Sequence, residues 1–221
     1  YSGNYSGVGF AIPVNYAVNL AQQIIDGKTP THAQLGVSLS TVNAQNAKRY
    51  GLSVDEGAYV AAVSEGSGAA EAGLQEGDIV SLDAGVIYKG YHSDAARTVA
   101  VGTISPEAEK LIEVTRQCFF EGMKYAKAGN HLNDISSAIQ AYAESFGYGV
   151  VRDLVGHGIG THLHEDPEVP NFAMKRKGLL LQPGMTLAVE PMINMGTYEV
   201  VWMDDDWTVV TKDHSLSAHY E

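Results

Sequence analysis

The chain has 221 residues, of which 45% are hydrophobic and 18% charged, a composition that excludes a wholly disordered protein. Its 14 basic and 26 acidic residues give a formal net charge of −12, which argues against nucleic acid and anionic membrane surfaces as partners and leaves room for a cation site. A single cysteine excludes an intramolecular disulfide and a cysteine-based zinc cluster. No apolar run is long enough for a transmembrane helix.

The first part of the chain predicts short strands separated by glycine-rich turns. In chain order we expect a strand over 7–13, a helix over 14–25, strands over 35–39 and 59–63, a helical turn over 69–72, and strands over 79–82, 85–88 and 98–101. The strands over 79–82 and 85–88 are expected to pair, around a turn near Lys89.

Two helices follow. Ser105 and Pro106, with acidic residues in the next turn, predict a helix start, and this helix is expected to continue to about Ala128. A second helix is predicted over 133–145, and strands over 185–193 and 207–210. Because the helices are grouped and do not alternate with strands, the fold class is α+β.

The composition changes near residue 80. The first eighty residues contain one histidine, whereas the remainder contains seven, together with both tryptophans and the cysteine. This shift predicts a domain boundary. The chain begins at Tyr1 without a signal-like segment and ends at Glu221 after a polar stretch, so we expect a fragment that continues at both ends.

Five residues of metal-ligand type lie in five separate segments of the chain after residue 80. They are Asp83, Asp94, His157, Glu190 and Glu221. Four carboxylates and one imidazole suit a pair of divalent first-row cations, which together can activate water and polarise a carbonyl. Two of them, Asp83 and Glu190, follow apolar strand patterns, where a carboxylate is costly to bury without a cation. The alternative is that each of the four carboxylates is an ordinary solvated acid.

The segments that carry these residues resemble the type I methionine aminopeptidases of the pita-bread (creatinase/aminopeptidase-like) fold. The matching stretches are EGDIVSLDAGVIYKGYHSDAARTVAVG, LVGHGIGTHLHEDPEVPNF, LQPGMTLAVEPMIN and DDWTVVTKDHSLSAHYE, within residues 76–221. The resemblance implies an incomplete pita-bread domain that removes N-terminal methionine from peptides and nascent proteins, impaired by a missing N-terminal half.

The resemblance also assigns residues. It implies two divalent ions (Mn, Fe, Co or Zn), with Asp83 on one ion, Asp94 and Glu221 bridging both, and His157 and Glu190 on the other. It implies that Glu190 moves a proton and that His164 contacts the scissile amide. It places Leu163 and Trp207 in the methionine pocket, where Leu163 departs from the aromatic residue usual in the family.

The first eighty residues resemble a different family, the HtrA-type serine proteases. Residues 1–30 match the closing strand of the protease domain and its connector helix, and residues 31–80 match a truncated PDZ domain. The resemblance implies a carboxylate-binding loop at Leu35, Gly36 and Val37 that holds the C-terminus of a peptide. Residues 76–80 fit both families, which suggests a chimera.

Three functions therefore stay open: a methionine-releasing metallopeptidase, an HtrA-type PDZ module that binds peptides without catalysis, and a product with no evolved function. The aminopeptidase resemblance favours a cytoplasmic location, whereas the HtrA-like part favours an extracytoplasmic one.

Overall fold

The structure, a computed structural model, describes residue 25 and residues 37–43, 47–48, 57–67 and 73–221. The chain divides into two units, Tyr1–Leu35 and Gly36–Glu221, and all the strands and both long helices described below belong to the second unit. The elements predicted over 7–13 and 69–72, and over 14–25 apart from the helical Ile25, lie outside the described residues.

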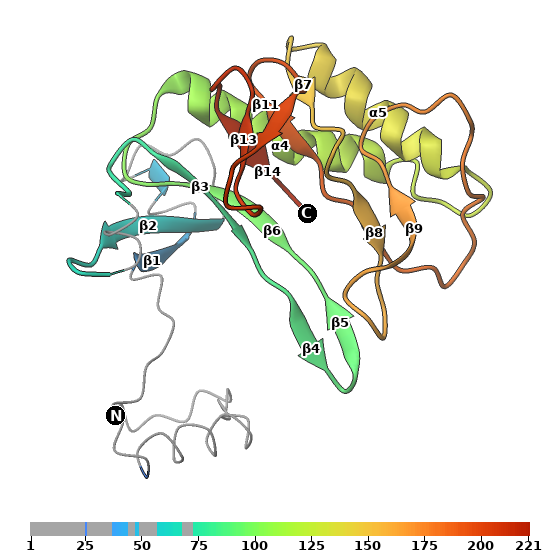
Figure 1. Cartoon of the computed structure of the whole chain (residues 1–221), viewed down its shortest axis with the longest axis horizontal. Helices are drawn as coiled ribbons and strands as arrows, with labels where there is room; N and C mark the ends of the chain where they lie inside the picture. Colours follow the sequence, from blue (N-terminus) through green and yellow to red (C-terminus); the bar gives the residue numbers. More distant parts are fainter. Residues whose placement is uncertain (1–24, 26–36, 44–46, 49–56, 68–72) are drawn as a thin grey trace. The chain divides into compact units, whose positions relative to one another are not determined.

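The strands before the helices form three antiparallel pairs. β1 (Val37–Val42) pairs with β2 (Gly57–Val63), β3 (Ile79–Asp83) pairs with β6 (Ala96–Ala100), and β4 (Val86–Tyr88) pairs with β5 (Tyr91–Ser93). Lys89 and Gly90 both have positive φ and form the two-residue turn between β4 and β5, a geometry that matches the twist of a hairpin. Figure 1 shows the β4–β5 pair continuing the β3–β6 pair as one long ribbon that extends away from the helices.

β2 packs against β6 within this unit. The side chain of Val60 is buried with those of Val99 and Val101, and the main chain of Val60 bridges to Val101. Residues 57–63 are therefore in contact with the strand pair that carries Asp83 and precedes the helices.

α4 (Pro106–Met123) and α5 (Leu132–Glu144) are the long helices of the unit. The Ser105 hydroxyl accepts a hydrogen bond from the Ala108 N–H, which satisfies one of the free donors at the start of α4. At the start of α5 the Asp134 carboxylate accepts from the His131 N–H. Both helices therefore begin within a residue of where the sequence predicts.

The strands that follow the helices are short and pair with partners distant in the sequence. They are β7 (Gly149–Val150), β8 (Gly156–Gly158), β9 (Glu165–Val169), β10 (Leu187–Ala188), β11 (Met192–Asn194), β12 (Val200–Trp202), β13 (Val209–Thr211) and β14 (Ser217–His219). The spatial orders are β10-β8-β9 and β14-β11-β7, with β12 and β13 as a separate pair.

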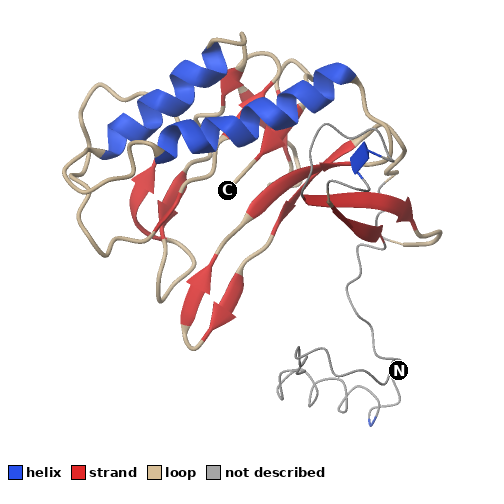
Figure 2. Ribbon diagram, turned by 180° about the vertical axis from the view of Figure 1, so that it is seen from behind, coloured by secondary structure: helices blue, strands red, loops and turns tan. Residues whose placement is uncertain are grey.

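The core lies between the two helices and the β14-β11-β7 sheet. Leu111 and Val114 of α4 and Ile139 of α5 are buried against Ile193 of β11 and Ala218 of β14. Figure 2 shows α4 and α5 lying next to each other along one side of the strands. The helices approach closely at Gly122, where an added Cβ would lie 2.9 Å from Ile139 Cγ1. This packing fixes β11 and β14, which carry or adjoin the residues of the candidate site.

Three details of the predicted elements are wrong. β3 pairs with β6 and not with residues 85–88, which pair instead with β5. α4 ends at Met123, short of Ala128, because the N–H groups of Tyr125 and Ala126 bond to carbonyls three residues back and form tight turns. The strand predicted over 185–193 is two strands, since Pro191 has no N–H to continue the ladder.

The remaining predicted strands are found with shifted ends. Those predicted over 35–39, 59–63 and 207–210 correspond to β1, β2 and β13, and 98–101 overlaps β6. Among the described residues, no helix combines the length and the apolar character that crossing a membrane requires.

Candidate metal centre

The β3–β6 pair brings two carboxylates to the same end of a ribbon. Asp83 is the last residue of β3 and lies opposite Ala96, and the Ala84 N–H donates to the Ala95 carbonyl at 3.1 Å. Asp94 precedes β6 by two residues, so the hairpin holds it beside Asp83. Gly85 lies beside this pair: a Cβ at that position would be 3.9 Å from Asp94 Oδ1, an ordinary van der Waals distance.

Glu221 joins the two aspartates from the other end of the chain. Its N–H donates to the Ala96 carbonyl at 2.9 Å, and its main-chain oxygen accepts from the Arg97 guanidinium, which also covers the ring of Tyr220 at 3.8 Å. One carboxylate oxygen from each of Asp83, Asp94 and Glu221 lies within 4.8 Å of the others. Three acidic groups from sequence-distant strands thus converge on one point.

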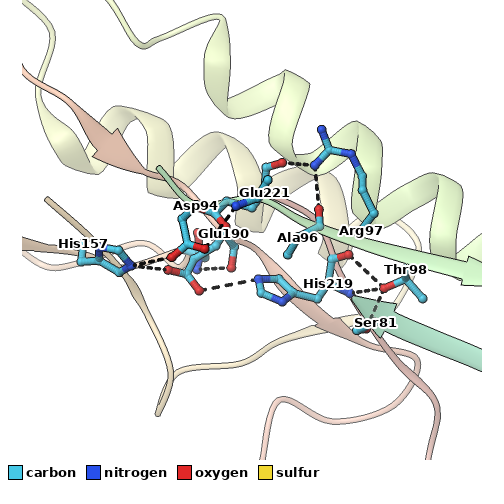
Figure 3. Close-up of polar contacts among 11 residues, drawn as sticks. Ser81, Asp94, Ala96, Arg97, Thr98, His157, Glu190, His219 and Glu221 are labelled. Atoms are coloured by element: carbon cyan, nitrogen blue, oxygen red, sulfur yellow. Dashed lines mark hydrogen bonds and ion pairs between the residues drawn. The ribbon is translucent and has the colours of Figure 1, made fainter. Parts of the chain in front are cut away.

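His157 and Glu190 come from a second sheet. His157 is in β8 opposite Ala188 of β10, and Glu190 follows β10. His157 Nε2 is 3.3 Å from Glu190 Oε1 and 3.8 Å from Asp94 Oδ2 (Figure 3). Asp94 therefore lies in both groups, next to Asp83 and Glu221 on one side and next to His157 on the other.

The tautomer of His157 follows from its other ring nitrogen. Nδ1 is 2.9 Å from the Gly158 carbonyl oxygen, which can only accept, so Nδ1 carries the proton. In the neutral ring Nε2 then presents a lone pair to two carboxylate oxygens. Acceptors face acceptors in this arrangement, and only a proton or a metal cation between them makes it favourable. The donor set fits a transition-metal cation.

Two carboxyl groups of the cluster have raised pKa values. Partial burial of the Asp83 carboxyl, followed by the charge of Asp94, raises the pKa of Asp83, although the residue as a whole is exposed. Burial and the charges of Asp94, Glu190 and Asp83 raise the pKa of Glu221 to about 8, with Arg97 opposing the shift. The accumulated negative charge is what a bound cation would offset.

His219 is a histidine beside this centre that the sequence analysis did not select. It is the last residue of β14, and its Nε2 is 3.6 Å from Glu190 Oε2. A signal for it was present in the sequence: it lies two residues before Glu221, so in an extended segment both side chains point to the same face.

The residues predicted to contact the substrate differ in their distance from the acidic cluster and in their contacts. The exposed His164 ring packs edge-on against His157, with centroids 4.5 Å apart, and Leu163 Cδ1 lies 3.5 Å from the position a Cβ would occupy on Gly85. Trp207 is 85% exposed, in the turn between β12 and β13, where its N–H donates to Asp205. No contact recorded among the described residues joins the Trp207 side chain to the acidic cluster, and its place in a methionine pocket stays a prediction.

The predicted carboxylate-binding loop falls at the edge of the described chain. Leu35 and Gly36 lie outside the described residues, and Val37 is the first residue of β1, paired with Val63. The PDZ-like assignment of this segment stays a prediction.

Known proteins with similar sequences and structures support the metal-centre interpretation. The sequence pattern of the metallopeptidase family M24 matches residues 21–214. A methionine aminopeptidase of Clostridium acetobutylicum is 61% identical over 148 residues, which cover 67% of this chain and 59% of that protein. The chain thus spans about three fifths of the length of this relative.

Solved structures give the same result. Methionine aminopeptidases from Thermotoga maritima and Rickettsia prowazekii match with TM-scores of 0.64 and 0.65 and sequence identities of 46% and 43%. Each match covers 66% of this chain, and 59% and 60% of the solved chains respectively. These likenesses confirm the predicted pita-bread fold with mixed α and β content.

Proposed function

Because the chain belongs to metallopeptidase family M24, we propose that its acidic cluster binds two divalent ions and hydrolyses the bond after an N-terminal methionine. The substrates are the N-termini of peptides and nascent chains. The observation that carries this proposal is the convergence of Asp83, Asp94 and Glu221 beside the His157–Glu190 pair. The names of the relatives given above support the choice of methionine.

The five residues divide between two ions as the resemblance to methionine aminopeptidases implies. Asp83 would hold one ion, His157 and Glu190 would hold the other, and Asp94 and Glu221 would be shared between them. The position of Asp94 between the two groups supports this division. A ligand set of carboxylate oxygens and one imidazole suits Mn, Fe, Co or Zn better than Ca²⁺, which takes oxygen ligands.

The chain's own side chains then have separate tasks. When bound, the two ions supply Lewis acidity and an activated water. Glu190 has carboxylate oxygens facing two imidazoles, and its carboxylate would hold a proton and pass it to the leaving amine. His164, which stacks edge-on against His157, donates to the scissile amide as charge develops on it. Leu163 and Trp207 line the pocket for the methionine side chain.

Release of methionine from a Met-Ala-Ser peptide tests this proposal. We expect turnover only after Mn²⁺ or Co²⁺ is added, and its loss in Asp94→Asn, because that residue adjoins both halves of the cluster. Glu199→Gln is the control: its carboxylate lies outside the cluster and pairs with Lys212 at 2.7 Å. Methionine release that is unchanged by a chelator or by Asp94→Asn would contradict the proposal.

A second proposal concerns residues 31–80, which precede the acidic cluster in the sequence and lie within the stretch that the M24 pattern matches. Residues 31–80 would bind the C-terminus of a peptide as a partial PDZ-like module, following residues 1–30, which resemble the end of an HtrA-type protease domain. The arrangement that such binding would extend is the antiparallel pair of β1 and β2. Fluorescence anisotropy with a peptide, compared with its C-terminally amidated form, tests it: equal affinity contradicts carboxylate recognition. For the metallopeptidase activity we propose a cytoplasmic location.

A further inference from the structure

We propose that His219 is a positioning residue for Glu190: its Nε2–H donates a hydrogen bond to Oε2 and so directs Oε1 toward His157. The second part of the test rests on the metal centre proposed above, whereas the first does not. His219 Nε2 is 3.6 Å from Glu190 Oε2, just outside hydrogen-bond distance, and the two side chains are only 11% and 13% exposed (Figure 3).

The ring nitrogen needs this partner. Among the described residues Nε2 of His219 is buried and makes no hydrogen bond, and Glu190 is the acidic residue in contact with it. A buried nitrogen without a partner is destabilising, so the small movement that closes 3.6 Å to a hydrogen bond is favourable. A carboxylate oxygen only accepts, and the proton therefore belongs on Nε2.

The main chain of His219 is held so that the ring cannot easily withdraw. Its N–H donates to Thr98 Oγ1 at 2.7 Å, and the Thr98 hydroxyl donates back to its carbonyl at 2.9 Å. Ser81 Oγ lies 2.8 Å from the same hydroxyl and must donate, because the Thr98 proton is already used. His219 also pairs across β14 and β11 with Met192, which follows Glu190 by two residues. Contacts with three other strands thus fix the main chain from which this ring projects.

The two oxygens of Glu190 consequently have different neighbours. Oε1 is 3.3 Å from His157 Nε2, whose lone pair is directed toward the cation site, whereas Oε2 faces the donor on His219. The terminal torsion of a glutamate is broad and only weakly restricted. Without His219 the plane of the carboxylate would turn over a wider range, and the direction of the oxygen that faces His157 would no longer be fixed. Groups that orient a metal ligand in this way typically change metal affinity or activity 10–100-fold on mutation.

The first test uses the metal-free full chain. Nitrogen-15 NMR of the histidine rings reports which nitrogen is protonated. We expect His219 with its proton on Nε2, slow to exchange with water, in contrast to the Nδ1-protonated His157. A neutral His219 ring protonated on Nδ1 would overturn the proposal whether or not the chain binds metal.

The second test separates positioning from a merely structural role. For His219→Leu we expect binding of the ion next to Glu190 to weaken about 10–100-fold in a Co²⁺ titration, with a changed visible absorption of the bound Co²⁺. His219→Gln keeps an N–H donor and should restore both within about threefold, which loss of packing alone would not explain. The matched control is His162→Leu, an exposed histidine 3.6 Å from Glu165, which should bind Co²⁺ as the unaltered chain does.

The outcomes distinguish this proposal from the proposed function. If His219→Leu and His219→Gln weaken Co²⁺ binding equally, or if neither does, His219 does not position Glu190. If the unaltered chain binds Co²⁺ but releases no methionine, the proposed activity fails while the role of His219 is still decided by the spectra.

Discussion

Lowering the pH from 8.5 to 7.0 should weaken Mn²⁺ binding to this chain about eightfold through Glu221 alone, because a metal ligand must lose its proton before it binds. The carboxyl of Glu221 is partly buried and faces the charges of Asp94, Glu190 and Asp83, which raise its pKa to about 8. An ordinary glutamate would be fully ionised at both pH values and would contribute no such dependence.

The magnitude follows from the ionised fraction. With a pKa of about 8, the fraction of Glu221 that is ionised is about 0.09 at pH 7.0 and about 0.76 at pH 8.5, a ratio of about eight. Metal binding should then release about 0.7 more protons from this carboxyl at pH 7.0 than at pH 8.5. Both quantities can be measured without a substrate.

Isothermal titration calorimetry under anaerobic conditions, in buffers of different ionisation enthalpy, measures affinity and proton release together. Glu221→Gln cannot titrate, so its affinity ratio between the two pH values should be about eightfold smaller than that of the unaltered chain. Glu199→Gln is the control, because this surface glutamate pairs with Lys212 outside the cluster and should leave the ratio unchanged. Equal ratios for the unaltered chain and Glu221→Gln would refute the reasoning.

Three further predictions concern stability and binding. The raised pKa values of Glu221 and Asp83 mean that the folded metal-free chain holds protons that the unfolded chain releases. Its melting temperature, measured by scanning calorimetry, should therefore fall as pH rises from about 5 through 8. The fall should be less steep in Glu221→Gln. Leu111→Ala should cost about 2–5 kcal/mol of unfolding free energy in urea, because the side chain is fully buried, whereas Leu216→Ala, at 42% exposure, should stay within about 0.5 kcal/mol. Asp94→Asn should weaken binding of both ions by more than about tenfold in the calorimeter; loss of only one ion would argue against a shared ligand.

The local elements were largely predictable from the sequence. The cap at Ser105 sets the start of α4, and the apolar alternation before Asp83 identifies β3. The predictions that were wrong depend on contacts between residues far apart along the chain or on the turns that follow a helix. The partner of β3 is β6, thirteen residues beyond Asp83, and nothing local distinguishes that pairing from a hairpin with residues 85–88. The early end of α4 depends on the turns after Met123.

The candidate site shows the same division. The ligand types and the segments that carry them could be read from the sequence, but their convergence could not. His219 belongs to a strand of only three residues that exists because it pairs with β11, so its two-residue spacing from Glu221 is the one local sign of its place. Its relation to Glu190 becomes visible only once β11 and β14 lie together. The side chain of Trp207, by contrast, is exposed on a turn. Local sequence patterns do not determine whether such a side chain lines a substrate pocket.

The central claim is that Asp94 lies between two divalent ions in this cluster. Anomalous X-ray scattering from crystals grown with Mn²⁺ tests it most directly. We predict two peaks roughly 3.5–4 Å apart, one beside Asp83 and the other beside His157 and Glu190, with Asp94 and Glu221 in contact with both. A single peak, or peaks away from these five residues, would contradict the two-ion metallopeptidase centre.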